Sequence, residues 1–187
     1  MPANATRLHA LLERLSAVFR ASLRETATRH GLKLVQLEAL VYLATANRYS
    51  DTPAALTEYL GVTKGTVSQT LTALARRGLL TKAPDREDAR VRHCHLTAEG
   101  RRIARAAYPA DVLVGLGANE GAEDALEALL RRLQRANGLR TFGVCHTCRF
   151  FQPRGAGGRC GLTGEALSRL EVTKICREHQ DPTPEPT

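Results

Sequence analysis

Four cysteines in the last quarter of the sequence have the spacing of a metal site. Cys145 and Cys148 form a C-x-x-C pair, Cys160 follows after eleven residues, and Cys176 follows after fifteen more. A C-x-x-C turn allows two thiolates to hold one ion, and the glycine-rich run over residues 154–159 allows the chain to fold back and deliver a third. In a reducing compartment this pattern argues for a metal before a disulfide. We therefore expect these four cysteines to bind one metal centre.

Two metal chemistries remain open for these cysteines. Four thiolates suit tetrahedral zinc or an iron–sulfur cluster. Zinc is preferred because it is the commoner metal in such sites. Cys176 and His179 could also form a second pair of zinc ligands that leaves Cys160 spare. A cluster is favoured by the absence of a second C-x-x-C and by the needs of a sensor. The remaining alternatives are four unliganded cysteines or a redox disulfide.

The fifth cysteine stands apart from this group. Cys94 falls in the second of two expected strands, where a lone cysteine is expected to be a small buried hydrophobic residue. His93 and His95 alternate with it and share the opposite face of the strand. We expect both histidines to be surface residues rather than ligands.

The composition limits the class of protein that carries these cysteines. The chain has 187 residues, 43% of them hydrophobic, which suits one globular domain with an appendage. Aromatic residues make up only 4% and there is no Trp, so Leu, Val and Ala must build the core, as they do in helical proteins. No stretch reaches the roughly 18 apolar residues of a membrane span. We expect a mostly helical, cytoplasmic protein with no membrane partner.

Basic residues concentrate in one segment. The net charge is +8, and residues 61–105 alone carry +6, with ten Lys or Arg against four Asp or Glu. A concentrated basic stretch is the electrostatic footprint of a polyanion, whereas a merely solvated surface spreads its charge. The charge distribution therefore indicates a nucleic-acid partner for this segment.

Apolar residues at spacings of three and four predict the helices that must position these groups. The expected helices span residues 6–29, 34–45, 53–60 and 64–77. Asp51 or Thr52 can cap the third helix, and Thr63 can cap the fourth. Because only Gly61 and Val62 separate the third helix from that cap, the pair is expected to form a helix-turn-helix.

Two strands and two further helices follow. Residues 79–82 and 91–96 flank a polar segment and predict a β-hairpin wing. A helix is expected from residue 97 to about 114, bent at Pro109, and a last helix capped by Asn119 runs to about residue 136. The first and last helices carry apolar stripes that could join a second chain or pack within this one.

The fourth helix is expected to turn a polar face outward. Gln69 can bond adenine bidentately in the major groove, Ser and Thr can contact bases or phosphates, and Lys64 at the helix start suits a phosphate. An ordinary solvent-facing helix would show a similar pattern, and the adjoining wing favours DNA reading. The residues on this face and its flanks are Gly65, Thr66, Ser68, Gln69, Thr72 and Arg76.

At this helix and wing the sequence resembles the MarR family of winged-helix transcription regulators. The resemblance covers about residues 8–135 and is most specific in GLLTKAPDREDAR, residues 78–90, and in LTAEG, residues 96–100. Asp88 and Arg90 match the family's Asp-x-Arg element, which implies that the arginine reaches the DNA minor groove and the aspartate holds the wing loop. The resemblance also implies a homodimer joined by the first and last helices, and a palindromic operator.

The expected architecture is a mostly α fold of the α+β type, a winged helix-turn-helix with dimerisation helices at both ends and a small four-cysteine extension. Residues 1–33 form the N-terminal dimerisation helix, 34–105 the DNA-binding domain, 106–138 the C-terminal dimerisation helices, 139–180 the extension and 181–187 a disordered tail. The extension departs from the family and has few apolar groups, so a bound metal would help to order it. The expected DNA-contacting residues are Thr63, Lys64, Thr66, Ser68, Gln69, Thr72, Arg86 and Arg90.

The leading interpretation is a sequence-specific regulator of double-stranded DNA, expected to be a repressor, whose cysteine-held centre is structural or senses metal or redox state. A small-molecule or redox effector is a further expected partner. The alternatives are a metal- or cluster-bearing redox protein, or an interaction module, that retains a winged helix. An enzyme is not expected, because four thiolates fill a tetrahedral shell and the sequence shows no nucleophile motif or glycine-rich phosphate loop.

Overall fold

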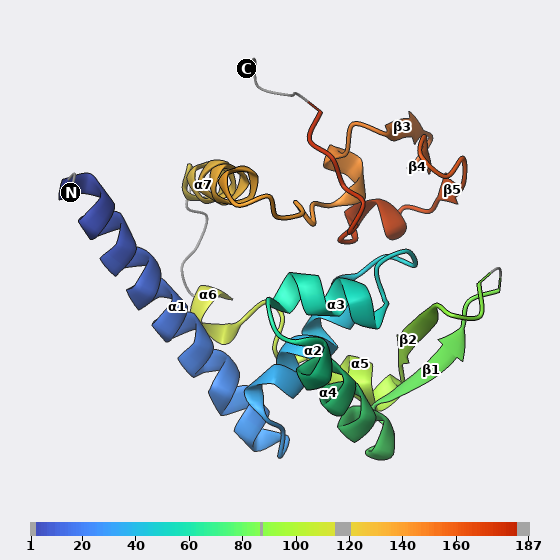
Figure 1. Cartoon of the computed structure of the whole chain (residues 1–187), viewed down its shortest axis with the longest axis horizontal. Helices are drawn as coiled ribbons and strands as arrows, with labels where there is room; N and C mark the ends of the chain where they lie inside the picture. The colour runs from blue at the N-terminus through green and yellow to red at the C-terminus, as the bar shows by residue number, and fades with distance from the viewer. Residues whose placement is uncertain (1–2, 87, 115–120, 183–187) are drawn as a thin grey trace.

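The structure is a computed structural model that describes residues 3–86, 88–114 and 121–182. Its helices are α1 (Ala3–Arg29), α2 (Leu34–Thr45), α3 (Pro53–Leu60), α4 (Lys64–Arg76), α5 (Ala98–Arg105), α6 (Asp111–Val114) and α7 (Ala122–Ala136). Its strands are β1 (Leu80–Pro84), β2 (Arg92–Leu96), β3 (Phe151–Arg154), β4 (Gly157–Cys160) and β5 (Ala166–Leu167). The predicted mostly helical fold with a winged helix is confirmed (Figure 1).

The helix-turn-helix begins and ends as its sequence predicts. Thr52 caps α3 by accepting a hydrogen bond from the backbone N–H of Ala55, at 3.3 Å. Thr63 caps α4 by accepting one from the N–H of Thr66, at 3.2 Å. Gly61 closes α3 at a φ of 63°, a left-handed conformation that glycine adopts without a steric penalty. These local signals fix the angle at which α4 leaves the core.

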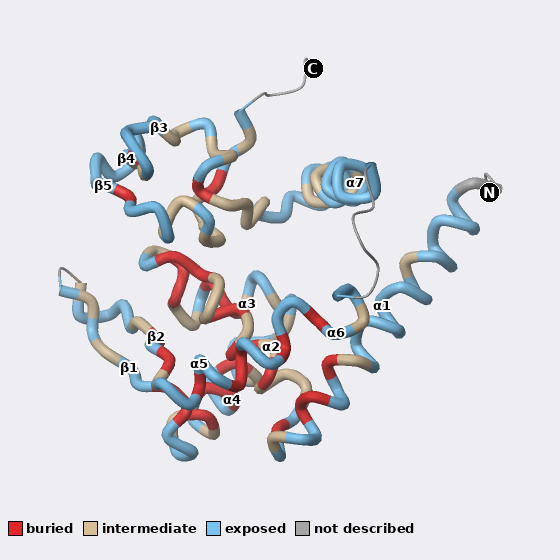
Figure 2. The backbone as a smooth tube through the Cα atoms, turned by 180° about the vertical axis from the view of Figure 1, so that it is seen from behind, coloured by how far each residue is buried: buried red, intermediate tan, exposed pale blue. Residues whose placement is uncertain are grey.

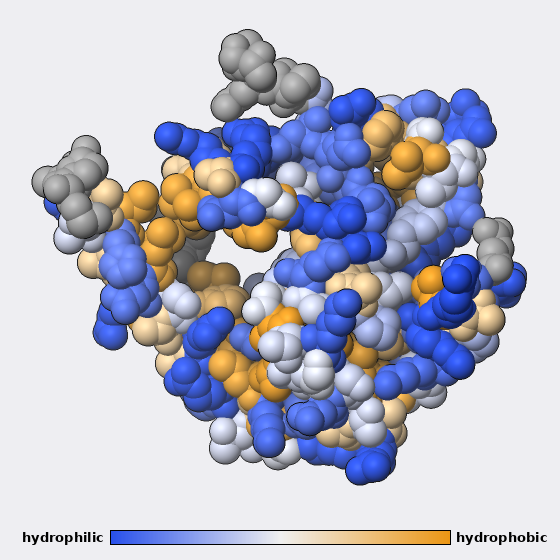
Figure 3. All heavy atoms as spheres, in the orientation of Figure 1, coloured by the Kyte–Doolittle hydropathy of each residue, from blue (hydrophilic) through white to orange (hydrophobic). Residues whose placement is uncertain are grey.

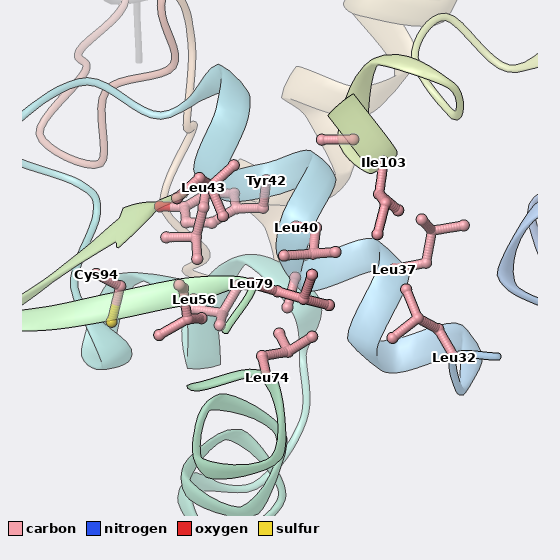
Figure 4. Close-up of a cluster of buried hydrophobic side chains, with 14 of the residues drawn as sticks. Leu32, Leu37, Leu40, Tyr42, Leu43, Leu56, Leu74, Leu79, Cys94 and Ile103 are labelled. Carbon is pink, nitrogen blue, oxygen red and sulfur yellow. The ribbon is translucent and has the colours of Figure 1, made fainter. Parts of the chain in front are cut away.

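The core forms where α2 crosses the middle of the winged helix. Leucines from α2, α3 and α4 point toward one another beneath the wing, and Ile103 of α5 covers their far side (Figure 4). Figure 2 shows the buried backbone concentrated in the same central region. At about 25 cal/mol per Å² of apolar surface, this burial is the main stabilising contribution to the domain. The fully buried leucines are Leu37, Leu40, Leu56, Leu71, Leu74 and Leu80.

The wing is a two-stranded antiparallel hairpin whose register runs from Leu80 opposite Leu96 to Pro84 opposite Arg92. Strand β1 begins one residue later than the sequence pattern predicts, because Leu79 bonds instead to Leu74 of α4 and to Thr97, and it ends two residues later, at Pro84. Strand β2 also begins one residue later than predicted, at Arg92. Cys94 is buried in β2, as expected, and this burial raises the pKa of its thiol to about 11.

The single helix expected over residues 97–114 is wrong, because the chain forms two helices there. Thr97 caps α5, which ends at Arg105, and α6 begins only at Asp111. Pro109 lacks a backbone N–H and cannot continue a helical ladder, so the chain breaks before it rather than bending at it. Helix α7 starts after Gly121, while the expected cap Asn119 lies outside the described residues.

The apolar stripes of α1 and α7 remain on the surface of the chain. Figure 3 shows hydrophobic side chains along the upper part of α1 and on the neighbouring α7. None of the described helices is both long and apolar enough to cross a membrane. The exposed apolar residues are Leu8, Leu11, Leu15, Val18 and Phe19 on α1, and Leu126, Leu130 and Leu133 on α7.

The cysteine-bearing tail, residues 139–182, contains a three-stranded antiparallel sheet in the order β3–β4–β5 that the sequence analysis did not predict. It lies over α3 and the α2–α3 loop, residues 46–52 (Figure 1). Asp181, assigned by the sequence analysis to a disordered tail, instead pairs with Arg131 and Arg135 of α7 at 3.3 and 3.8 Å. The tail is therefore packed against the rest of the chain.

Candidate nucleic-acid interface and cysteine cavity

The outer face of α4 presents short polar side chains to solvent. Ser68, Gln69 and Thr72 are exposed, while the apolar side of the helix is buried in the core. Lys64 is exposed at the helix start. Thr63 and Thr66 are partly committed to the helix cap, since their hydroxyls lie 2.9 Å apart. The exposed polar side chains of α4 are therefore available to form hydrogen bonds with a binding partner.

The tip of the wing projects an arginine into solvent beside this helix. The Arg90 side chain is 92% exposed, and its Nε lies 3.1 Å from the Asp88 carboxylate. The same Asp88 oxygen also accepts from the Arg90 backbone N–H at 2.9 Å, so the aspartate fixes the turn that projects the arginine. Arg86 is likewise exposed. This geometry suits contact between an exposed guanidinium and DNA phosphates or a groove edge.

His93 is not the surface residue that its strand position predicts. Its Nδ1 pairs with the Asp51 carboxylate, and its Nε2 lies 3.0 Å from Asp85. The Asp51 hydrogen bond holds the pKa of His93 above its usual value, against the opposing effect of burial. His95, by contrast, is exposed as expected. Asp51 and His93 tie the α2–α3 loop to the wing, and no local sequence pattern indicates this contact.

The four tail cysteines come together around one cavity. The cavity has a volume of about 90 Å³ and an almost entirely apolar lining. Cys145 begins a short 3₁₀ helix, Cys145–Thr147, and Cys160 is the last residue of β4. Cys176 follows a second short 3₁₀ helix, Glu171–Thr173. The residues around the cavity are Cys145, Cys148, Cys160, Cys176, Asn47, Tyr49, Phe150, Phe151, Leu162, Thr163, Leu167 and Glu178.

N–H groups point at the cysteine sulfurs. The Asn47 side chain donates to Cys145 Sγ at 3.4 Å, and the backbone N–H of Gln180 donates to Cys148 Sγ at 3.5 Å. A hydrogen bond from Cys145 lowers the pKa of the Cys176 thiol, with Asn47 and the Glu178 backbone acting in the same direction and burial opposing them. Groups that stabilise thiolate also favour metal ligation, because the thiolate is the form that binds metal.

The described residues contain no group of three or more His, Cys, Asp or Glu side chains already arranged to hold a metal ion. The soft sulfur donors and their N–H partners fit a metal, but the side chains would have to close on it. His179 lies outside the cavity lining, and its two ring nitrogens face the hydroxyls of Thr141 and Thr147 at 2.9 and 3.0 Å. Burial lowers the pKa of His179, which favours the neutral form of its ring. The geometry therefore offers Cys160 rather than His179 as the partner of the other three cysteines.

A second hollow of about 710 Å³ lies between α3 and the segment that follows α7. Its volume is within the range of small-molecule sites. It is lined by Glu58, Tyr59, Leu130, Gln134, Gly138, Leu139, Arg140, Thr141 and Phe142.

Comparison with family models matches residues 30–91 to the MarR family. This segment contains the helix-turn-helix and most of the wing described above. Comparison with curated proteins finds no match.

Solved structures of MarR-type proteins share this fold. The Staphylococcus aureus MepR–DNA complex is 20% identical with a TM-score of 0.55, over 68% of this chain and 96% of MepR. Rhodococcus jostii CouR bound to p-coumaroyl-CoA is 19% identical with a TM-score of 0.57, over 73% and 95%. Sulfolobus solfataricus BldR, a transcriptional regulator, is 24% identical with a TM-score of 0.54, over 72% and 99%. The chain therefore has the fold of MarR-family transcription regulators.

Proposed function

We propose that this protein is a sequence-specific DNA-binding regulator, a repressor that acts on a palindromic operator in the cytoplasm and has no catalytic role. The observation that carries the proposal is the exposed polar face of α4 beside a wing whose Arg90 projects into solvent. The net charge of +6 over residues 61–105 supplies the attraction to phosphates. DNA-bound MepR supports the assignment by its similarity of fold.

The test is binding of the purified chain to DNA from upstream of its own gene, against random DNA, at physiological salt. Gln69→Ala should reduce discrimination between the two DNAs by about 1 to 3 kcal/mol, because under this proposal Gln69 contacts bases. Arg90→Ala should weaken binding to both DNAs and lower the salt dependence, because its guanidinium would contact phosphates or the minor groove. Matched controls are Gln152→Ala and Arg154→Ala, on the exposed face of β3. Wild-type binding by both site variants would refute the assignment.

The exposed stripes of α1 and α7 support a homodimer. Burial of such apolar faces against a second chain removes them from water, and two-fold symmetry would match a palindromic site. Polar substitutions at Leu12 and Leu130 should produce monomers or unfolded chains in sedimentation. A stable folded wild-type monomer at micromolar concentration would contradict the dimer.

We also propose that Cys145, Cys148, Cys160 and Cys176 hold one metal centre, zinc or alternatively an iron–sulfur cluster. The shared cavity and the N–H groups facing sulfur support the proposal. Such a centre would supply a cross-link between distant parts of the tail and, in the case of a cluster, redox sensitivity. Metal analysis with a visible spectrum of anaerobically purified protein separates the two. Protein with neither metal, from a host supplied with both, would leave a redox disulfide as the better account.

The hollow between α3 and the segment after α7 supports a small-molecule effector. CouR, of similar fold, binds p-coumaroyl-CoA. The ligand would have an apolar body that can lie against Tyr59 and Phe142 and a polar group that can contact Arg140.

A further inference from the structure

The α2–α3 loop touches the cysteine cavity and the wing through neighbouring residues. Asn47, which is only 2% exposed, and Ser50, which is fully buried, face the tail, whereas Asp51 faces the wing. The seven-residue loop thus lies between two regions that are otherwise separate in the fold (Figure 1). A short segment that is hydrogen-bonded to both regions can transmit a displacement, because packed structure has little room to deform.

The tail end of this connection begins at the cysteines. Asn47 donates its side-chain N–H to Cys145 Sγ, and its Oδ1 accepts from Ser50 Oγ at 2.7 Å and from the Tyr49 N–H at 3.1 Å. Ser50 Oγ in turn accepts from the backbone N–H of Arg177, the residue after Cys176, at 2.8 Å. The loop therefore contacts two separate cysteine-bearing segments.

Backbone bonds reinforce the same contact. The N–H of Ile175 donates to Thr45 O, and the N–H of Asn47 donates to Ile175 O, both at 2.8 Å. Ile175 also bridges to Val144 on its other side, so the residues before Cys145 and Cys176 lie beside the end of α2 as neighbouring extended segments. A ligand that draws the cysteines together would hold these segments, and with them the loop.

The wing end of the connection is Asp51. Its carboxylate pairs with His93, and its backbone oxygen accepts from the Cys94 N–H at 2.8 Å. His93 also reaches Asp85, at the base of the wing turn that carries Arg86 and Arg90. The position of Asp51 therefore bears directly on the wing, and Thr52 next to it caps the first helix of the helix-turn-helix.

We infer that the α2–α3 loop couples occupancy of the cysteine cavity to the order of the wing, so that loading the cavity strengthens DNA binding and emptying it weakens DNA binding. This coupling rests on the proposed DNA-binding function and on the proposed metal centre. Asn47 acts as a positioning residue, because it would hold a ligating sulfur without itself touching the metal or the DNA.

The experiment compares the full chain in three states: loaded with zinc alone, reconstituted with ferrous iron and sulfide under argon, and stripped by a chelator. In each state, amide exchange is measured over residues 46–52 and 80–96, and the dissociation constant is measured on the operator. In the wild type, stripping should speed exchange in both segments and raise the dissociation constant roughly tenfold, a usual size for coupling between sites. Exchange in α2 should not change.

Asn47→Asp isolates the proposed link. The variant keeps the Oδ1 acceptor for Ser50 and Tyr49 but loses the N–H directed at sulfur. It should still load one metal centre, while the difference in DNA affinity between loaded and stripped protein falls to within about twofold. Asn137→Asp is the matched control, because the Asn137 side chain donates to Leu133 O at the end of α7 rather than to a cysteine, and the variant should behave as wild type. If Asn47→Asp does not fold, Ser50→Ala and His93→Gln cut the connection on either side of Asp51 and should give the same loss.

The outcomes separate the two proposals. Unchanged wing exchange and unchanged DNA affinity in a wild type shown to have lost its metal would overturn the coupling and leave the DNA-binding assignment intact. A metal-dependent change in loop and wing exchange without DNA binding in any state would support the coupling and overturn the DNA-binding assignment. Failure of both zinc and iron with sulfide to bind would overturn the coupling together with the metal centre, while operator binding would still stand.

Discussion

The winged helix of residues 34–105 folds around leucines with no exposed surface, such as Leu40 and Leu56, whereas the tail of residues 139–182 has only Cys145, Leu167 and His179 as buried side chains. The tail is stabilised instead by its hydrogen bonds and ion pairs to α2, α3 and the loop between them, and by the metal centre that we propose for its cysteines. The first region has an apolar core that the second lacks, and we expect this core to stay ordered when the tail loosens. The second can therefore vary in order while the first stays folded, which is the property that a sensing element needs.

One part of the tail does share the core of the winged helix. The ring of Phe142 meets Tyr59 edge-on at 5.3 Å, and Tyr59 packs on Tyr42 at 4.5 Å between centroids. Phe142 adopts a φ of 49°, a left-handed conformation that costs a side-chain-bearing residue about 1 to 2 kcal/mol. The aromatic contacts offset this cost and fix the point at which the tail begins.

The largest expected effect is on the core of the winged helix. Leu40→Ala should lower the free energy of unfolding by about 2 to 5 kcal/mol, because it leaves a cavity among fully buried leucines. Urea unfolding of the full chain measures the loss. Leu170→Ala, at a tail residue that is 75% exposed, is the control and should change stability by less than about 0.5 kcal/mol. Equal losses would show that the two regions are not ordered differently.

Removal of a cysteine should affect the tail and spare the core. Cys148→Ser should abolish stoichiometric metal and speed amide exchange over residues 140–180 by about tenfold or more, because the ligands supply order that the tail lacks. Residues 34–45 and 53–79 should remain protected, whereas exchange in the α2–α3 loop and the wing should rise as it does in the stripped wild type. Cys94→Ala should retain the metal, since Cys94 lies in β2 away from the cavity. Loosening of α2 to the same extent as the tail would contradict this separation.

A smaller effect is expected from the ion pairs that dock the tail on α3. Glu58 accepts two hydrogen bonds from Arg177, at 2.7 and 2.6 Å, and lies 3.1 Å from Arg140. Glu58→Gln should loosen the tail by roughly 0.5 to 1 kcal/mol, the usual size for partly exposed pairs, seen as faster proteolysis of residues 139–182. Glu99→Gln, which removes the exposed pair with Arg102 on α5, should leave the tail unchanged.

Acid should reproduce the effect of Glu58→Gln in the wild type. The Arg177 guanidinium lowers the pKa of the Glu58 carboxyl in the folded chain. The stabilisation of the docked tail by Glu58 is therefore fully present above the unfolded pKa of about 4.3. It is lost as the pH falls through the lower pKa of the folded chain. Tail loosening in acid that is the same in wild type and Glu58→Gln would show that other groups are responsible.

Local sequence signals predicted the winged helix well because its elements are defined by their own residues. Thr52 and Thr63 cap the helices that they were expected to cap, and the apolar spacing gave α2 its limits. The tail sheet was missed, because β3 to β5 are short, rich in Gly and Arg, and without the alternation that marks a strand. These strands are stabilised by hydrogen bonds to one another, and a local sequence pattern does not show which segments will pair.

For the candidate site, the sequence predicted the grouping of the cysteines but not the long-range contacts around them. The four cysteines were grouped from spacing alone, and the structure brings all four to one cavity. The contact between His93 and Asp51 joins residues 42 positions apart, and Asn47 and Cys145 are 98 apart, so neither could be inferred from periodicity. Similarly, His179 has the spacing of a ligand, but its ring is held by two threonine hydroxyls.

The smallest expected effect is the pH dependence of the wing. Both ring nitrogens of His93 face carboxylates, of Asp51 and Asp85, and His95 is the other titratable group beside Asp51, at 3.4 Å. Because the folded pKa of His93 is raised, its tie is fully present below the unfolded value of about 6.5 and is lost as the pH rises through the folded value. Protection factors of the wing amides, corrected for the intrinsic rate, should fall by roughly threefold across that window, a fraction of the tenfold change that one full pKa unit would give. His93→Gln should abolish the dependence and start from the lower protection, while His9→Gln on α1, near only Glu13, should retain it. Wing protection that rises with pH, or a dependence that survives in His93→Gln, would assign the tie to another group and leave Asp51 bound to the wing through the Cys94 N–H alone.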